Sequence, residues 1–309
     1  MSTLVDPLPV PGGHLPLDVR PRRVVVGYDG SPESRAALRE AVARAGWAEA
    51  PLVVVTAAEP VAFAYELYPE IEALARGHAA DAMASAVEHL PLGDVSQHVA
   101  AGTPSSVLLQ LARPDDLLVV GTRGQGRVER WLLGSTSTGV ATHAPCPVLV
   151  VPRDARHDGA VVAGVDGSAA SWSVLAHARA EAARQGTSLQ VVSAVPPLPT
   201  RVEPDGLAVA AERQRVADVR RLLARLVEQA GVESLASVDV QVEADPAAEV
   251  LRRKAGAARL LVVGSKGHGG LHALLLGSVS RAVLHQTPCA VLVVRSPAWS
   301  ETPAGTPAA

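Results

Sequence analysis

Two stretches of this chain place glycines and hydroxyl side chains at the same spacing. VVGTRGQGRVERWLLGSTS, residues 119–137, carries Gly121, Gly124 and Gly134, followed by Ser135, Thr136 and Ser137. VVGSKGHGGLHALLLGSVS, residues 262–280, carries Gly264, Gly267 and Gly277, followed by Ser278, Val279 and Ser280. Glycines let a backbone turn sharply and approach a ligand. Free N–H groups at a helix start, with nearby hydroxyls, favour an anion. The two stretches therefore predict two anion-binding loops.

The same residues also fit a purely structural role. A buried strand that turns into a helix needs flexible residues in the turn and a small polar residue at the helix start. The repetition does not decide between the two interpretations, because a duplicated segment inherits its spacing.

An aspartate ends the first apolar strand of each copy: Asp29 in VVVGYDGSPES and Asp166 in VVAGVDGSAAS. Such a residue often caps its own turn. The alternative is a carboxylate that accepts hydrogen bonds from ligand hydroxyls, or helps to hold a divalent ion such as Mg²⁺ beside phosphates. Arg123 and Lys266 occupy matched positions inside the loops, where they either pair with phosphate or are solvated surface residues.

The bulk composition excludes several classes of protein. The 309 residues suffice for two domains, and the formal charge of -3 gives no general attraction to nucleic acid or to an acidic membrane. Two cysteines, Cys146 and Cys289, are too few for a disulfide scaffold and indicate a reducing compartment. The chain shows neither a signal peptide nor an apolar stretch long enough to cross a bilayer. We therefore expect a cytoplasmic protein with no nucleic-acid or membrane partner.

Three pairs of segments show that the chain is a duplication. VVVGYDGSPES (24–34) matches VVAGVDGSAAS (161–171), LLVVGTRG (117–124) matches LLVVGSKG (260–267), and CPVLVV (146–151) matches CAVLVV (289–294). We expect one domain at 22–152 and a second at 159–295, with disordered Pro/Ala-rich tails at 1–21 and 296–309.

Each copy alternates apolar strands with helices. In the first copy the expected strands are 24–27, 52–57, 95–99, 117–120 and 147–151, and the expected helices start at Pro32, lie within 66–90, and span 104–112 and 135–143. Ser31 is the expected N-cap of the first helix and Gly46 its stop. The alternation implies an α/β fold with a parallel sheet covered on both faces. Ligands of such sheets bind beyond the carboxyl ends of the strands, where both glycine loops belong.

The pattern G-x2-G-x9-G-[ST], present at 121/124/134/135 and at 264/267/277/278, resembles the ATP-binding signature of the universal stress protein family. The segments VVVGYDGSPES, LLVVGTRG and CPVLVVP are also similar to that family, and the resemblance covers about 22–152 and 159–295. It implies two tandem five-stranded parallel sheets in the order 3-2-1-4-5, with helices on both faces. Each would bind ATP or ADP at the switch point between strands 1 and 4, giving two sites per chain.

The resemblance also assigns roles to residues. Asp29 and Asp166 would contact ribose or phosphate, directly or through a metal ion, and Leu52 and Leu189 would line the adenine pocket. Gly121, Gly124, Gly264 and Gly267 would lie close to ribose and phosphates, and residues 134–137 and 277–280 would wrap the phosphate chain. The last strands, PVLVV and AVLVV, would pair within one chain as a pseudo-dimer, and a further pairing of whole chains stays open. The second copy departs from the first where Ala244 replaces Gly102 and Arg259 replaces Asp116.

Three functions are compatible with these features. The first is an ATP-binding regulator of a stress or dormancy response, the second a slow ATPase or self-phosphorylating enzyme, and the third a scaffold without nucleotide. No GxxxxGK[ST] motif and no obvious His or Glu base accompanies the glycines, so efficient hydrolysis is not indicated. The intact glycines argue against the scaffold. G-x-G-x-x-G is absent after the first strand of either copy, which disfavours a dinucleotide-binding oxidoreductase.

Overall fold

The computed structural model describes residues 18–58, 93–124, 133–196, 206–232, 237–266 and 276–295, with isolated positions at 73, 77, 80, 81, 84 and 235. Most of the expected tails, and almost all of the helix expected within 66–90, lie outside these ranges. Residues 18–21 are described. Val19 packs against the core cluster shared by the two halves, and the Arg20 guanidinium lies 5.4 Å from the centre of the Trp47 ring in α1. Packing in the first half therefore begins before residue 22.

The first half opens with β1 (Arg23–Gly27), whose three central valines are fully buried. Ser31 caps α1 (Pro32–Ala48) as expected, because its Oγ accepts a hydrogen bond from the Ser34 N–H at 3.1 Å. Pro32 occupies the first turn, where its missing N–H has no partner to lose. The remaining elements are β2 (Leu52–Ala58), β3 (Val95–Ala101), α3 (Pro104–Leu111), β4 (Asp116–Gly121), α4 (Ser135–His143) and β5 (Val148–Val151).

The end of α1 differs from the sequence expectation. The helix passes Gly46 and ends at Ala48, and its C-cap Glu49 has a left-handed backbone with φ 53°. The Glu49 N–H closes the helix by donating to Ala45 O and Gly46 O. The matching C-cap of the second half is Gly186, at φ 59°, where glycine meets no steric penalty. The expectation was wrong because the glycine of the first half does not stand at the left-handed position.

The second half repeats the same order of elements. They are β6 (Val161–Gly164), α5 (Ala170–Gln185), β7 (Leu189–Ala194), α6 (Gly206–Gln229), β8 (Val238–Glu243), α7 (Ala247–Ala255), β9 (Leu260–Gly264), α8 (Ser278–Gln286) and β10 (Ala290–Val294).

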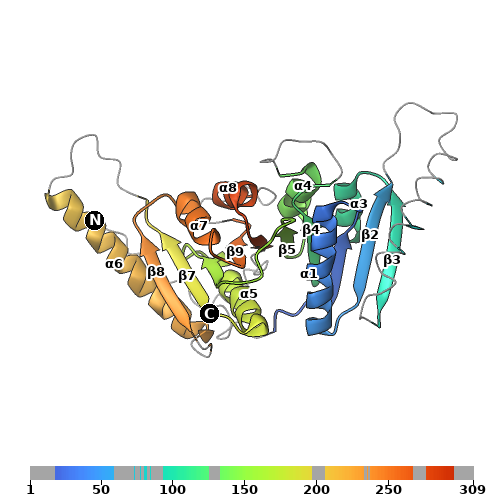
Figure 1. Cartoon of the computed structure of the whole chain (residues 1–309). Helices are drawn as coiled ribbons and strands as arrows, with labels where there is room; N and C mark the ends of the chain where they lie inside the picture. The colour runs from blue at the N-terminus through green and yellow to red at the C-terminus, as the bar shows by residue number, and fades with distance from the viewer. Residues whose placement is uncertain are drawn as a thin grey trace, which may run out of the picture.

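The described strands form one sheet in the order β3-β2-β1-β4-β5-β10-β9-β6-β7-β8 (Figure 1). Within each half the strands are parallel and follow the order 3-2-1-4-5, which confirms the predicted topology. The halves join where β5 and β10 pair antiparallel, with Leu149 opposite Leu292. The two expected five-stranded sheets are therefore halves of one continuous ten-stranded sheet, and the last strands pair within the chain as expected.

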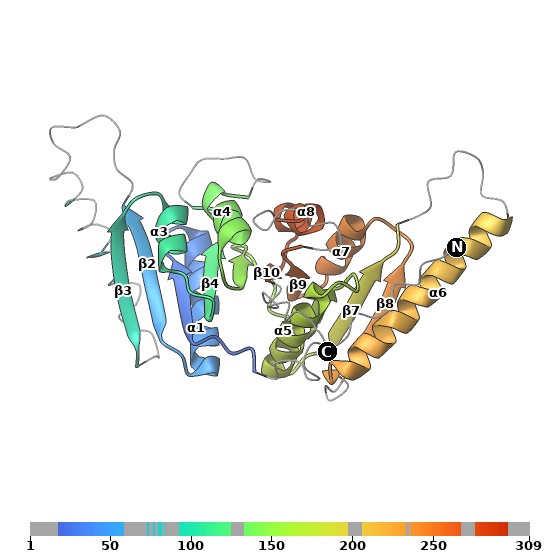
Figure 2. The ribbon, with the colours of Figure 1, turned by 180° about the vertical axis from the view of Figure 1, so that it is seen from behind.

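Helices cover both faces of the sheet, as the opposite views in Figures 1 and 2 show. Helices α1, α5 and α6 share one aliphatic core cluster with one set of strand side chains. Helices α3, α4, α7 and α8 pack with the other set on the opposite face. Since both faces of the central strands are buried, they are apolar throughout rather than alternating. No helix within the described ranges is both long and apolar enough to span a membrane.

Candidate functional site

A cavity lies at the carboxyl ends of β1, β2 and β4, where the strand order reverses between β1 and β4. It contains about 530 Å³ of empty space, part of it open to solvent. Six residues of the sequence-predicted set line it: Asp29, Gly121, Arg123, Gly124, Thr136 and Ser137.

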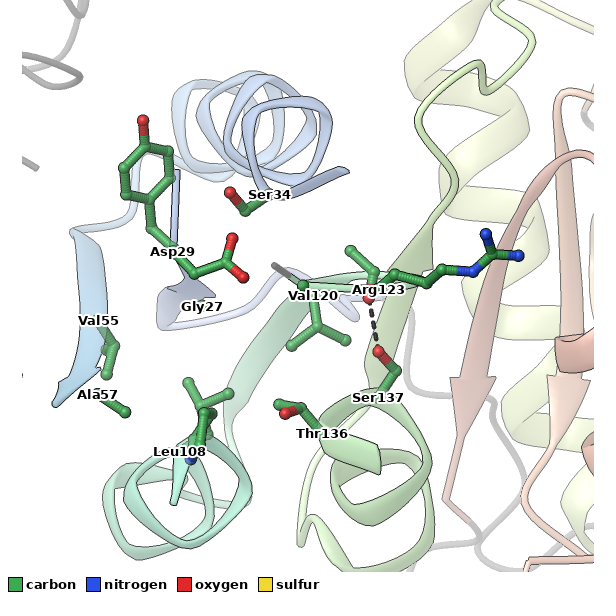
Figure 3. A pocket seen from close by; sticks show the side chains of 14 residues that line it. Gly27, Asp29, Ser34, Val55, Ala57, Leu108, Val120, Arg123, Thr136 and Ser137 are labelled. Carbon is green, nitrogen blue, oxygen red and sulfur yellow. Dashed lines mark hydrogen bonds between the residues drawn. The ribbon is translucent and has the colours of Figure 1, made fainter. Parts of the chain in front are cut away.

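One wall of the cavity is apolar. Val55 and Ala57 come from β2, Leu108 from α3 and Val120 from β4. Figure 3 shows these side chains around the cavity, with the carboxylate of Asp29 at another part of its rim beside Ser34. The cavity therefore offers an apolar surface on one side and polar groups on the other.

The start of α4 forms part of the polar side. Gly134 is the N-cap, and its N–H donates to Thr122 O at 2.8 Å. No side chain caps the first turn of α4, in contrast to α1, where Ser31 does so. A helix start without a side-chain cap leaves amide N–H groups that an anion can accept from. Thr136 brings this turn to the cavity wall, whereas Ser135, the first helical residue, is exposed.

The Ser137 hydroxyl holds the loop together. It is buried and donates to Gly121 O at 2.6 Å, which ties α4 to the end of β4 (Figure 3). Because its proton is given to a backbone carbonyl, this hydroxyl shapes the site rather than donating to a ligand. The sequence had assigned it to the phosphate chain.

Asp29 fills the structural one of the two roles that the sequence left open, and its contact with a ligand stays a prediction. Its Oδ1 accepts the Ser31 N–H at 2.9 Å, which caps its own turn. Its Oδ2 faces the glycine loop so closely that a Cβ on Gly124 would lie 2.4 Å from that oxygen. The absence of a side chain at Gly124 thus allows the loop to approach the carboxylate.

Gly121 is required by packing against α1 rather than by an approach to Asp29. A Cβ at this position would lie 2.8 Å from both the carbonyl carbon and the Cβ of Glu33, in the first turn of α1. Gly264 shows the same relation in the second half, where a Cβ would lie 3.0 Å from Lys266 O and 3.2 Å from the Cβ of Ala170. Gly121 is therefore needed by the fold whether or not a ligand binds, whereas at Gly264 the neighbours would have to shift by only a few tenths of an ångström.

Arg123 reaches the cavity with only part of its side chain. Figure 3 shows its guanidinium pointing away from Asp29 and from the apolar wall. In this conformation the positive charge does not face the cavity.

Leu52 and Leu189 lie elsewhere than the resemblance implied. Both begin their strands, are fully buried, and belong to the core cluster beneath α1, α5 and α6. Successive side chains of a strand point to opposite faces, so Val55 and Ala57 lie on the other face and nearer the carboxyl end. These two residues form the apolar wall, and the alternation along β2 was the signal that could have identified them.

The second half reproduces the loop but not the surroundings of the aspartate. Gly277 is an N-cap without a side-chain cap and donates to Ser265 O at 2.8 Å, and Ser280 Oγ donates to Gly264 O at 2.6 Å. Ser278 and Val279 follow as the first residues of α8, and Lys266 precedes the gap at 267–275, so Gly267 lies outside the described residues.

Asp166 is held by its own loop. Its Oδ1 accepts hydrogen bonds from the Ser168 N–H at 2.9 Å, the Ser168 Oγ at 2.6 Å and the Ser171 Oγ at 3.2 Å. In the second half, two serine hydroxyls therefore donate to Asp166 Oδ1. In the first half, the equivalent oxygen of Asp29 accepts a backbone N–H.

Neither a protein-built metal site nor a reactive thiol appears among the described residues. No three His, Cys, Asp or Glu side chains in these ranges come together as metal ligands. Asp29 or Asp166 would therefore need phosphate oxygens to complete the coordination of Mg²⁺. Burial raises the pKa of both Cys146 and Cys289 to about 12, so these thiols stay protonated at neutral pH.

The sequence pattern of the universal stress protein family matches residues 21–152 and 159–295. A universal stress protein of Mycolicibacterium smegmatis is 34% identical over 301 residues, covering 88% of this chain and 96% of that protein. Universal stress protein Rv2005c of Mycobacterium tuberculosis is 34% identical over 294 residues, covering 89% of this chain and 99% of that protein. The chain belongs to the universal stress protein family, as a tandem member with two copies of the domain.

Solved structures support the same fold. A protein of unknown function from Pseudomonas aeruginosa PAO1 is similar with a TM-score of 0.66 at 18% identity, over 90% of this chain and 93% of that one. A universal stress protein from Archaeoglobus fulgidus is similar with a TM-score of 0.61 at 19% identity, over 90% of this chain and 99% of that one. Both similarities extend over the two halves of the chain.

Proposed function

We propose that this protein binds ATP or ADP in the cavity of the first half, and in the corresponding crevice of the second, and acts as a nucleotide-dependent regulator of a stress or dormancy response. The observation that carries the proposal is the division of the cavity into an apolar wall and a polar side. Membership of the universal stress protein family supports the regulatory part.

Each part of the cavity suits one part of an adenine nucleotide. The base would bury its faces against Val55, Ala57 and Leu108, because apolar walls hold the bulk of most small ligands. The ribose hydroxyls would donate to Asp29. The phosphates would accept from the amides at the start of α4, and their negative charge is favoured at the positive end of the helix dipole. Mg²⁺, when bound with the nucleotide, would neutralise phosphate charge beside Asp29.

The cavity favours binding over hydrolysis. Among its described lining residues Asp29 is the only carboxylate, and no histidine is present. Asp29 already accepts the Ser31 N–H and faces Gly124, so it is held as a binding group. Rapid phosphoryl transfer needs a group that positions the attacking water and clamps that stabilise the transferred phosphoryl.

Release of nucleotide from the purified protein tests the proposal. The protein would be isolated without added nucleotide, denatured, and the released small molecules separated by chromatography. We expect adenine nucleotide approaching two per chain, and calorimetric binding of ATP to protein stripped of it. A protein that carries none, and gives no heat with ATP, would contradict the proposal.

A pair of matched substitutions locates the sites. Ala57→Ile would fill the apolar wall of the first cavity, and Ala194→Ile makes the same change at the matching position of β7. We expect each single variant to bind one ATP per chain and the double variant to bind none. If Ala57→Ile leaves both stoichiometry and affinity unchanged, the base does not lie against β2.

A further inference from the structure

The two halves meet about an approximate two-fold axis. In the β5–β10 pair, Val148 lies opposite Val293, Leu149 opposite Leu292, and Val150 opposite Val291. Leu149 and Leu292 are equivalent positions of the duplication, so each faces its own counterpart, and the flanking valines exchange partners in the same way. A contact of this kind is self-complementary. The strand pairing alone would therefore be satisfied equally by two first halves, two second halves, or one of each.

A pair of charged side chains is among the contacts that break this equivalence, beside the bonds from Arg295 to the carbonyls of Ala141 and Thr142. Arg44 of α1 and Glu181 of α5 also occupy equivalent positions, 137 residues apart, and meet across the axis on the face that α1 and α5 cover. Arg44 Nε lies 3.1 Å from Glu181 Oε1, and Arg44 Nη2 lies 3.3 Å from Oε2. The Arg44 side chain is 2% exposed and that of Glu181 9%. A buried ion pair with two hydrogen bonds therefore lies at the axis of the pseudo-dimer. Its two residues occupy the same position of the duplicated sequence, which is arginine in the first half and glutamate in the second.

Each half also supplies a charge of its own to this network. Glu40, one turn before Arg44, accepts from its guanidinium, and His157 Nδ1 lies 3.6 Å from Glu40. Arg184 Nη2 lies 2.8 Å and Gln185 Nε2 2.7 Å from Glu181 Oε2. Burial opposes ionisation of Glu181, but Arg44 and Arg184 outweigh it and hold its pKa below the usual range. Arg259 is a further positive charge near this group, and burial lowers its pKa.

We propose that the Arg44–Glu181 pair selects the partner of each half: a first half accepts a second half and rejects another first half, and likewise for second halves. Two first halves in the same arrangement would bring two Arg44 guanidiniums together at the buried axis, and two second halves would bring two Glu181 carboxylates together. Like charges that cannot reach water repel strongly, and a charge that loses its partner in a buried position is destabilising. The apolar edges of β5 and β10 would otherwise allow either mispairing.

Cutting the folded full-length chain between its halves tests the selection directly. A protease site would be placed at Arg153–Asp154, whose side chains are 62% and 95% exposed. The cut protein would be unfolded in urea, refolded by dialysis, and its pairs of halves identified by native mass spectrometry. We expect the natural sequence to return only mixed pairs. The neutral variant Arg44→Gln/Glu181→Gln should return all three pairings, close to the statistical ratio of about one to two to one.

Each result of this experiment is decisive. If the neutral variant also returns only mixed pairs, the selection lies elsewhere in the interface. If the natural sequence returns all three pairings, there is no selection. In a background with Glu40→Gln and Arg184→Gln, which removes the like charges beside the swapped residues on the same helices, the charge-swapped variant Arg44→Glu/Glu181→Arg should behave like the natural sequence, because its charges are again opposite only in mixed pairs.

Unfolding of the intact chain covers the case in which cut halves do not refold. Arg44→Glu and Glu181→Arg, each made in a background with Glu40→Gln and Arg184→Gln, place like charges at the axis and should lower the urea midpoint, whereas the charge-swapped double variant in that background should recover most of the loss. Recovery would show that opposite charge at these positions, rather than the size of either side chain, is what the interface requires. A double variant as unstable as the sum of the two single changes would overturn the proposal.

Discussion

The same local sequence, Asp-Gly-Ser, behaves differently in the two halves. In DGSPES, Pro32 begins α1 and leaves Ser31 outside the helix. The Ser31 hydroxyl caps the first turn, and Asp29 Oδ1 accepts the Ser31 backbone N–H. In DGSAAS, Ala169 is in the helical region but α5 begins at Ala170, and Ser168 donates its hydroxyl to Asp166. A proline that fixes where the helix begins therefore changes what the preceding serine and aspartate can do. The comparison teaches that a repeated motif need not produce two identical sites.

Both halves nevertheless keep the bonds that shape the glycine loop. The Ser137–Gly121 and Ser280–Gly264 hydrogen bonds have the same length, and Gly134 and Gly277 donate to equivalent carbonyls at the same distance. These contacts lie inside the fold, where any change would disturb packing. The differences lie at the crevice rim, where the fold constrains the residues less.

The largest expected effect is on the free energy of unfolding, at the interface position that is arginine in the first half and glutamate in the second. Arg44→Met breaks the buried ion pair and leaves Glu181 with Arg184 and Gln185 as its remaining partners, and we expect a loss of about 3–5 kcal/mol in the free energy of unfolding at pH 7. The pKa of Glu181 is lower in the folded than in the unfolded chain. The ionised carboxylate therefore stabilises the fold above the unfolded carboxyl pKa of about 4.3, and this stabilisation is lost as the pH falls through the folded pKa. The difference between variant and natural protein should therefore shrink on acidification.

Urea unfolding between about pH 3 and 7 measures this effect. Arg156→Met provides the control, because Arg156 pairs with Asp158 at the surface, where both side chains are 43% or more exposed. We expect the control to change stability by less than about 0.5 kcal/mol. A difference for Arg44→Met that grows as the pH falls would contradict the assignment of the charge to Glu181.

The first glycine of the two motifs gives the next largest effect. Gly121→Ala brings a methyl group within 2.8 Å of the backbone of Glu33, whereas in Gly264→Ala the nearest atom is 3.0 Å away. Overpacking of this kind destabilises by about 1–3 kcal/mol, and we expect the larger loss at Gly121. Thermal unfolding of both variants should be compared with Gly93→Ala, where a Cβ meets nothing within 4 Å. Equal stability of Gly121→Ala and Gly93→Ala would contradict the packing role.

The aspartates provide the test closest to function. Asp29→Asn removes a charged acceptor from the first cavity, and a hydrogen bond to a charged group contributes about 1.5–3 kcal/mol, so we expect ATP affinity there to fall by roughly 10- to 100-fold. Asp166→Asn should weaken nucleotide binding less, because Asp166 Oδ1 already accepts from Ser168 and Ser171. Calorimetric titration of both variants measures the two sites. A larger loss of affinity from Asp166→Asn would reverse the comparison.

The smallest expected effect is at the ends of α1 and α5. Glu49 holds the left-handed conformation that Gly186 holds in the second half. A side chain costs about 1–2 kcal/mol there, so Glu49→Gly should raise the free energy of unfolding, partly offset by the greater entropy of glycine in the unfolded chain. Gly186→Ala should lower it. Melting temperatures of the two variants should move in opposite directions, and a shift in the same direction would show that these positions are not equivalent.

Much of the fold could be predicted from the sequence because its signals are local. The apolar strands, the Ser31–Pro32 helix start and the helix at 135–143 follow from short-range patterns, whereas the strand order came from the resemblance to the universal stress protein family. The residues around Asp29 and Gly124 could also be foreseen, since the carboxyl ends of adjacent parallel strands meet at one edge.

The sequence by itself thus determined the two-copy α/β fold and the position of the glycine loops at the ends of the strands, and the pairing of the two halves through their last strands followed from the resemblance to the family. Only the tertiary structure decided that Val55 and Ala57, rather than Leu52, form the apolar wall, that Ser137 is occupied by Gly121, and that Arg44 meets Glu181. The physical reason is distance along the chain. Strands and turns are set by neighbouring residues, whereas the partner that a side chain finds depends on distant segments, as Arg44 and Glu181 show at 137 residues apart.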